Sequence, residues 1–424
     1  MTSTSRSMAL YARLSDMFLH RTLVLSSLIA TIAISACSGD DASTAISDTT
    51  VPTAEAATTE VPATDAPAAT LDPATEAMAY TEPGEYPVGV TTLELAAGNK
   101  VEVWYPAIAG TTGTESYDVR DFVPDAIRAL LTADIPASYT YTAGRDAAVA
   151  DGTFPIVLFS HGYSGIRLQS TFLTSHLASW GMIVIAPDHW SRDLNHVLSA
   201  PVGDRESSVT ELLASLDLVT AGNDDPASLF QGHLDTSRVI ALGHSAGGGT
   251  IVGAAADDRV YGYISMASGV IGMGGANATT TAPPTFINKP SFFIAGAADG
   301  VVPVDTVSRP SFKAVPGPSR LWVIDGVGHN GFDDFCTFGN GSGIIGVALA
   351  SGLGPLLDAQ PQLKTLGQDG CLPPAQPVDL GFPIIKHAVT AQLRFWFGDD
   401  ATPVGLDSSV GDQYDLAVSI DSKD

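Results

Sequence analysis

The chain has 424 residues, 45% of them hydrophobic, so it is long enough for one large domain or two ordinary ones. Its 46 acidic and 20 basic residues give a formal net charge of −26 at pH 7. This charge argues against nucleic acid and anionic membrane surfaces as partners.

The first 37 residues have the pattern of an export signal. A basic flank precedes an apolar run at 22–33, which is too short to span a bilayer comfortably. The sequence ISAC at 34–37 resembles a bacterial lipobox, which predicts lipid attachment at Cys37. The alternative is an ordinary signal peptide that is cut nearby. Either interpretation predicts an exported protein. The first predicts a cell-envelope lipoprotein and the second a secreted protein, and contact with a membrane is expected only through a lipidated N-terminus.

Residues 38–83 differ in composition from the rest of the chain. They are rich in Thr, Ala, Pro, Asp and Glu and contain no Lys or Arg. Such a segment cannot bury enough apolar area to offset its conformational entropy, so it is expected to be a disordered linker. The folded domain is expected at 84–400, and residues 401–424 are expected to form an acidic tail beyond it.

From residue 84 onward, short β-like runs alternate with helical patterns, which predicts an α/β domain with a mostly parallel central sheet and helices on both faces. Runs at 91–95 and 100–105 flank an Ala-Gly-Asn turn and predict an antiparallel hairpin. Continuous apolar runs predict buried strands, and apolar residues at helical spacing predict helices. The remaining strands are expected at 155–160, 182–186, 238–242, 261–266, 291–295 and 320–324. The helices are expected at 170–180, 206–220 and 383–397.

Two stretches interrupt this alternation. Residues 107–150 lie between the hairpin and the first buried strand, and residues 336–382 lie between the last strand and the closing helix. Either insertion could cover an active site, although surface elaboration is the simpler interpretation. In an exported protein Cys336 and Cys371 form an even pair, so a disulfide is expected; two buried free thiols are the alternative.

A glycine-flanked serine follows the expected strand at 238–242. A serine hydroxyl is a poor nucleophile unless a base takes its proton, and it must also stand clear of the sheet. Gly243 and Gly247 leave room for a tight turn between strand and helix, with Ser245 at its tip. This context predicts Ser245 as the nucleophile rather than a serine satisfied within a glycine-rich turn. No Lys follows the glycines, which argues against a phosphate loop.

The acid and the base of such a site come after the serine in the chain, each just beyond a strand. Asp299 and His329 occupy these places. Asp325 is a rival acid, but it lies at a strand end very close to His329, so Asp299 is preferred. Three other histidines are weaker candidates for the base, because they fall on expected helix or connector positions: His176, His233 and His387.

Two backbone N–H groups are expected to bind the oxyanion that forms on a substrate carbonyl. One belongs to Ala246 at the start of the helix, where the helix dipole also helps. The other belongs to Tyr163, in a loop where the flexible Gly162 would aim it. His161 in the same loop is expected to hold the loop by hydrogen bonds.

A cluster in the 188–196 segment could be imagined as a metal site. Its members are Asp188, His189, Asp193 and His196. No metal-ligand spacing such as HExxH supports this reading, so a loop at the rim of the site is preferred, and no metal or other cofactor is expected.

With these motifs the chain resembles a group of α/β-hydrolases: platelet-activating-factor acetylhydrolase-like lipases, dienelactone-hydrolase-like proteins and actinobacterial polyester hydrolases (cutinases). The resemblance covers about residues 84–400 and rests on segments 84–89, 103–106, 159–165, 177–181, 243–250, 296–303 and 328–329. The segments 243–250 and 296–303 are most similar to the polyester hydrolases. The resemblance implies the α/β-hydrolase fold, a triad of Ser245, Asp299 and His329, and oxyanion donors at Tyr163 and Ala246.

Departures from the group bear on the substrate. Polyester hydrolases share a tryptophan just after the strand that follows the nucleophile helix. The corresponding residues here, 265–269, are Ser-Met-Ala-Ser-Gly, with no aromatic residue. This absence argues against cleavage of aromatic polyesters. Some acetylhydrolases carry the triad acid near the same place, and none stands here, which favours Asp299. In dienelactone hydrolases the nucleophile is a cysteine, so the serine at position 245 argues against that activity.

The sequence therefore predicts a serine carboxylic ester hydrolase that acts on short-acyl lipid or polyester-type esters. A thioesterase or peptidase would use the same residues. The alternative of a different class is a catalytically silent surface lipoprotein that binds a ligand in the hydrolase cleft.

Overall fold

The computed structural model describes residues 78–199, 207–271 and 286–424, which belong to one compact unit, Leu71–Asp424. Cys37 and most of the expected linker lie outside the described residues, so lipidation and the linker stay predictions. In the described stretches no helix combines the length and the hydropathy needed to cross a membrane.

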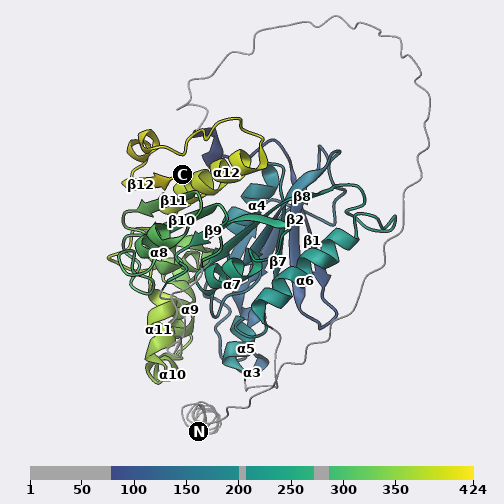
Figure 1. The fold of residues 1–424 in the computed structure, drawn as a ribbon. Helices are drawn as coiled ribbons and strands as arrows, with labels where there is room; N and C mark the ends of the chain where they lie inside the picture. Colours follow the sequence, from purple (N-terminus) through teal and green to yellow (C-terminus); the bar gives the residue numbers. More distant parts are fainter. Residues whose placement is uncertain (1–77, 200–206, 272–285) are drawn as a thin grey trace, which may run out of the picture. The chain divides into compact units, whose positions relative to one another are not determined.

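Strands and helices alternate along the described chain (Figure 1). The strands are β1 Val88–Glu94, β2 Lys100–Pro106, β3 Glu115–Asp118, β4 Ser138–Tyr141, β5 Gly144–Arg145, β6 Phe154–Ser160, β7 Ile183–Pro187, β8 Leu234–His244, β9 Val260–Met266, β10 Ser291–Gly296, β11 Ser319–Ile324 and β12 Val418–Lys423. The α-helices are α3 Asp125–Arg128, α4 Thr171–Ser179, α5 Leu194–Leu198, α6 Ser208–Ala221, α7 Ala246–Ala254, α8 Ser308–Ala314, α9 Gly343–Ala350, α10 Gly354–Asp358, α11 Pro361–Gln368 and α12 Val378–Phe397.

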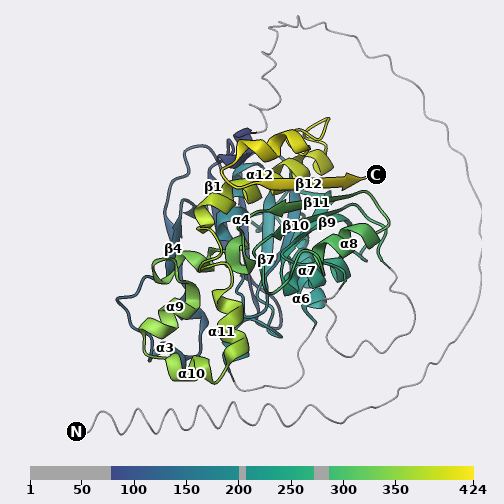
Figure 2. The same ribbon diagram turned by 90° about the vertical axis from the view of Figure 1, so that its left-hand side faces the viewer.

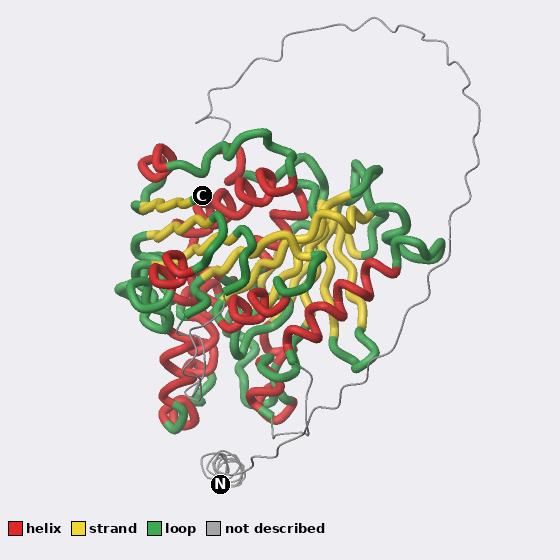
Figure 3. Tube along the Cα trace, in the orientation of Figure 1, coloured by secondary structure: helices red, strands yellow, loops and turns green. Residues whose placement is uncertain are grey.

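Ten of the described strands form one sheet in the order β12-β11-β10-β9-β8-β6-β7-β2-β1-β5. The run from β11 to β7 is parallel. The pairs β12–β11, β7–β2 and β2–β1 are antiparallel, and the short edge strand β5 pairs parallel with β1. Figure 3 shows the strands as a central layer between helices. The prediction of a mostly parallel sheet with helices on both faces is confirmed.

The central strands are buried on both faces because each face packs against its own layer of helices. Every residue of β6 is buried, and its side chains alternate between two cores. Phe159 packs into the core that includes residues of α4 and α12, whereas its neighbour Leu158 packs into the core that includes residues of α6, α7 and α8. Leu242 and Ala241 of β8 divide in the same way. This period-two division explains why these strands read as continuous apolar runs.

Both ends of the predicted domain need correction. The sequence predicts a tail at 401–424, whereas β12 pairs antiparallel with β11 along its whole length and closes one edge of the sheet. At the other end Tyr80, inside the expected linker, is buried. Its ring packs edge-on against Trp180, and its hydroxyl donates to Asp400 at 2.6 Å. The folded region therefore includes residues on both sides of the predicted limits.

The closing helix also begins earlier than predicted. α12 starts at Val378 and continues through Pro383. Pro383 is the sixth residue of this helix and has no N–H to donate to the carbonyl of Asp379, yet the helix continues past it.

The two insertions contact each other. The N–H of Thr132 donates to Ser351 Oγ at 2.9 Å, and the N–H of Gly339 donates to the carbonyl of Pro136 at 2.7 Å. We call residues 115–141 together with 335–371 the cap. Figure 2 shows the cap helices α3, α9, α10 and α11 gathered beyond one end of the sheet. The two insertions therefore form one structural unit.

Candidate active site

Ser245 lies at the tip of the turn between β8 and α7. Its φ is 54° and its ψ is −121°, a backbone conformation that costs a non-glycine residue about 1–3 kcal/mol. The turn is held because the Ser245 N–H donates to the carbonyl of Met266 at 3.0 Å. A Cβ on Gly247 would lie 1.9 Å from the carbonyl oxygen of Ser160, and one on Gly243 would lie 2.5 Å from the carbonyl oxygen of Gly247. The glycines on either side of the serine are thus required by close backbone approach.

The structure brings the three predicted residues together. His329 follows β11, and its Nε2 lies 2.9 Å from Ser245 Oγ. Its Nδ1 lies 2.9 Å from Oδ2 of Asp299, which follows β10. The exposed fractions are 7% for Ser245, 1% for His329 and 5% for Asp299, so little water competes for these hydrogen bonds. The arrangement suits proton transfer from the hydroxyl to the imidazole.

The carboxylate of Asp299 is fixed by its own loop. Its Oδ1 accepts hydrogen bonds from the N–H groups of Val301 and Val302 at 2.8 and 2.7 Å, which leaves Oδ2 directed at the imidazole. The rival acid Asp325 is exposed and accepts from the N–H of Gly326. Among the hydrogen bonds of the described residues, none joins Asp325 to His329.

The expected oxyanion donors flank the nucleophile. Ala246 begins α7 directly after Ser245. A Cβ on Gly162 would lie 3.3 Å from Ser245 Cβ, so the loop that carries Tyr163 runs close beside the serine. None of the hydrogen bonds found among the described residues uses the N–H of Tyr163 or of Ala246 as its donor. Their role as oxyanion donors stays a prediction.

A buried chain of side chains links this loop to the base. The N–H of Gly162 donates to Gln169 Oε1 at 3.1 Å, and Gln169 Nε2 donates to Nδ1 of His244 at 2.9 Å. His244 Nε2 then donates to the backbone carbonyl of His329 at 3.0 Å. Burial lowers the pKa of His244 to about 3, so its ring is neutral and can accept at one nitrogen and donate at the other. The sequence alone assigned no role to Gln169 or His244. The only sequence signal for His244 is its position directly before Ser245 in the serine motif.

His161 holds the same loop, as expected. Its Nδ1 donates to the carbonyl of Gly162 at 2.8 Å, and its Nε2 accepts from the N–H of His189 at 2.9 Å. Burial, reinforced by the nearby charge of Arg192, lowers the pKa of His161 well below its usual value. Its ring is therefore neutral and fully engaged, which leaves it no proton-transfer role.

The 188–196 segment makes hydrogen bonds to the loop that carries Tyr163. Arg192 is buried and donates to the carbonyl of His161 and to Ser160 Oγ, each at 2.7 Å. Burial lowers the pKa of Arg192 to about 10, which leaves it charged at neutral pH. His189 Nδ1 lies 2.9 Å from Oε2 of Glu211, whose pKa is raised to about 7 by burial. No group of three or more His, Cys, Asp or Glu side chains in the described stretches is placed to hold a metal ion.

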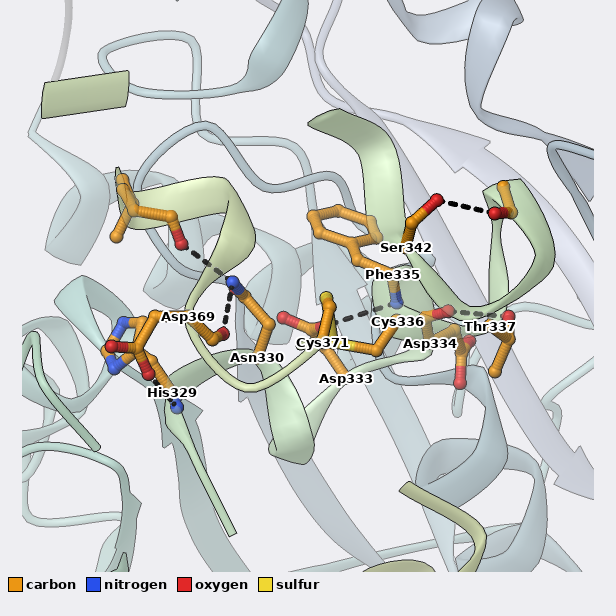
Figure 4. Close-up of a disulfide and its surroundings, with 12 residues drawn as sticks. His329, Asn330, Asp333, Asp334, Phe335, Cys336, Thr337, Ser342, Asp369 and Cys371 are labelled. Atoms are coloured by element: carbon orange, nitrogen blue, oxygen red, sulfur yellow. Dashed lines mark hydrogen bonds between the residues drawn. A yellow bond between two sulfur atoms is a disulfide. The ribbon is translucent and has the colours of Figure 1, made fainter. Parts of the chain in front are cut away.

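One residue of the cap holds both the base and the acid loops. Asp369 Oδ1 accepts from the N–H of His329 at 2.8 Å, and its Oδ2 accepts from the N–H of Gly300 at 3.0 Å. Figure 4 shows Asp369 beside His329, and close to the disulfide of Cys336 and Cys371 that the sequence predicts. Sequence reasoning missed Asp369 because a single acid in a Gly-rich insertion carries no motif.

The comparisons with known proteins identify the family of the chain. A family model described as PET hydrolase-like matches residues 138–349, which is half of the chain. Cutinase 2 of Thermobifida cellulosilytica is 28% identical over 188 residues, 42% of this chain and 62% of that protein. A bis(hydroxyethyl) terephthalate hydrolase of Streptomyces coelicolor is 26% identical over 170 residues, 40% of this chain and 47% of that protein. The chain spans about half the length of the curated relatives it matches.

A solved structure supports the fold. A ferulic acid esterase from Streptomyces cinnamoneus is 19% identical, with a TM-score of 0.51, over 80% of this chain and 98% of that one. The predicted resemblance to polyester hydrolases is confirmed by the family match, which includes Ser245, Asp299 and His329. The chain belongs to the PET hydrolase-like family.

Proposed function

We propose that the chain is a serine carboxylic ester hydrolase that acts on lipid or polyester-type esters. The observation that carries the proposal is the hydrogen-bonded series from Ser245 through His329 to Asp299, with 2.9 Å at each link. Membership of the PET hydrolase-like family supports an ester bond as the target, as do relatives named as cutinases.

Each residue of the site has a distinct role in this proposal. His329 Nε2 takes the proton of Ser245 as its oxygen attacks the ester carbonyl carbon, while Asp299 holds the imidazole and stabilises its charge. The Tyr163 and Ala246 N–H groups bind the oxyanion. When the tetrahedral intermediate collapses, the imidazolium gives its proton to the leaving alcohol. Water, activated by His329, then hydrolyses the acyl-enzyme and restores Ser245. No metal or other cofactor has a role in these steps.

A fluorophosphonate probe tests the nucleophile. Wild-type protein is expected to become covalently labelled and Ser245→Ala to remain unlabelled. Ser237→Ala is the matched control, because Ser237 lies on an exposed stretch of the same strand, β8. Absence of labelling in the wild type would favour the silent surface lipoprotein, and equal labelling of Ser245→Ala would place the reactive group elsewhere.

The leaving group separates the hydrolases that share this machinery. We expect kcat/KM for alkyl esters to exceed that for thioesters and peptide amides of the same acyl group, because one relative is named as a hydrolase of the ester bis(hydroxyethyl) terephthalate. A higher kcat/KM for the thioester would indicate a thioesterase, and turnover of the amide comparable with that of the ester would indicate a peptidase.

We also propose that the protein is exported and carries lipid on Cys37. The proposal rests on the ISAC segment at 34–37. It predicts a lipid mass shift in the protein made by a bacterial host, which Cys37→Ala abolishes. An unmodified mature protein would contradict lipidation and favour a secreted form.

A further inference from the structure

The cap lines most of a partly open apolar cavity of about 140 Å³. Both insertions contribute to its wall, together with α5 between them. Typical members of the lining are Val123, Ile127, Leu194, Val347, Leu353 and Leu366. Because the walls come from segments far apart in the sequence, the cavity exists only when the two parts of the cap are packed together.

The cavity adjoins the proposed catalytic centre. Tyr163, whose N–H is a proposed oxyanion donor, forms part of its lining. So does Asn330, the residue directly after His329. These two residues connect the cavity to an ester held at Ser245.

The lining offers hydrocarbon contacts and no charge. Its polar members are Tyr163, Ser164 and Asn330, which are a proposed oxyanion donor and the residues that directly follow that donor and His329 in the sequence. The amide of Asn330 already donates to the carbonyls of Leu366 and Asp369 at 2.7 and 2.8 Å. Ser164 Oγ is buried and has no hydrogen-bond partner among the described residues. The rest of the lining matches only apolar groups.

The size of the cavity limits the group it takes. Apolar cavities of about 150 Å³ lined by aliphatic side chains bind a six-carbon ring such as benzene. A cavity of 140 Å³ therefore fits about six carbons, which is more than an acetyl group needs. This size differs from the short acyl group that the sequence resemblance favours.

We infer that the cap cavity binds a hydrocarbon chain of the ester substrate, about six carbons long, on the acyl or the alcohol side of the ester bond. The inference rests on the proposed function, because it assigns the chain to an ester held at Ser245. It names medium-chain aliphatic esters as the substrate class.

Two ester series test the inference. One is p-nitrophenyl esters from acetate to palmitate, and the other is alkyl acetates with alcohols of the same lengths. Each methylene that enters the cavity is expected to raise kcat/KM about fourfold, so a six-carbon chain exceeds the shortest by on the order of 100-fold in one series. A maximum at the shortest ester in both series would overturn the inference.

Two substitutions on α9 locate the effect. Ala348 lines the cavity, whereas its neighbour Leu349 is 40% exposed and does not. Ala348→Phe fills the cavity and is expected to lower the ratio of six-carbon to two-carbon kcat/KM at least tenfold. Leu349→Phe adds an aromatic ring at the next position and is expected to leave the ratio unchanged. Equal ratios in both variants and the wild type would overturn the inference.

Folding and chemistry are controlled separately. Val123→Phe fills the cavity from the other insertion, so it gives the same test if Ala348→Phe does not fold. Fluorophosphonate labelling distinguishes the two proposals. Labelling with no chain-length dependence overturns the cavity inference alone, whereas no labelling of the wild type overturns both.

Discussion

Around Ser245, three loops that follow parallel strands are joined by hydrogen bonds, whereas the cap presents mainly aliphatic side chains to its cavity. In the first region the polar groups of His329, Asp299 and His244 are directed at one another. In the second, most of the lining has no donor or acceptor to direct. The two regions meet at Tyr163 and Asn330.

The difference arises from the role proposed for each region. Proton transfer requires heavy atoms within hydrogen-bond distance and fixed orientation, so each group needs partners that hold it. Binding of a hydrocarbon chain depends on the area removed from water and tolerates small shifts. Substitutions in the centre should therefore change rate steeply, and substitutions in the cap should change selectivity.

The largest expected effect is that of Asp299→Asn. An amide cannot hold the imidazole in the required tautomer, and loss of a triad carboxylate in this way lowers kcat about 10⁴-fold. Asp325→Asn is the matched control, because Asp325 follows the adjacent strand β11 and is exposed. Steady-state kinetics on p-nitrophenyl esters measures both variants. A larger loss in Asp325→Asn would transfer the acid role to that residue.

Removal of the disulfide tests how much this bond within the cap contributes to the stability of the protein. Cys336 and Cys371 close a 35-residue separation within the cap, and Cys371 lies two positions after Asp369. Replacing both with Ala is expected to lower the free energy of unfolding by about 3 kcal/mol. Urea unfolding measures the change, and addition of a reductant should destabilise the wild type but not the double variant. Equal stability of the two proteins would mean that the cap does not depend on the disulfide.

The buried carboxyl of Glu211, which lies beside His189, should make the free energy of unfolding depend on pH. Burial raises the pKa of Glu211 to about 7, so the folded protein holds this proton more tightly than the unfolded chain does. As pH rises from about 4.5 to 7, the unfolded chain loses the proton first, and stability falls by up to about 3 kcal/mol. This contribution is present in full below that range and lost above it.

Glu211→Gln is expected to remove this fall. Urea unfolding of the wild type and the variant between pH 5 and 8 measures the difference between their free energies of unfolding. Glu85→Gln, at an exposed position, is the control and should keep the wild-type profile. An unchanged profile in Glu211→Gln would show that the buried carboxyl does not titrate in this range.

Sequence pattern was sufficient for the centre because its features are local. Each of Ser245, Asp299 and His329 follows an apolar run, and the carboxyl ends of parallel strands share one edge of a sheet. Once the strands are parallel, the three side chains must lie at the same edge. The last strand was missed: Val418 and Ile420 alternate with polar residues, but the acidic composition led to the prediction of a tail.

The cap could not be predicted in the same way. Its helices are short, and its cavity depends on contacts between residues near 130 and residues near 350, which no local periodicity encodes. Asp369 and Gln169 act through hydrogen bonds to backbone groups distant in the sequence. Without a motif or a spacing rule, only the three-dimensional arrangement assigns them a place.

The smallest expected effect concerns Asp369, which joins the two regions. Its carboxylate accepts from the N–H groups of both His329 and Gly300, and an amide in its place can accept at one oxygen only. Asp369→Asn is therefore expected to shift the base loop slightly and lower kcat about tenfold, with little change in KM, because the residue positions the base without binding the chain. Asp358→Asn, at an exposed cap position paired with Lys364, is the control. A change in KM with unaltered kcat would assign Asp369 to substrate binding, and loss of the chain-length preference would assign it to the cavity.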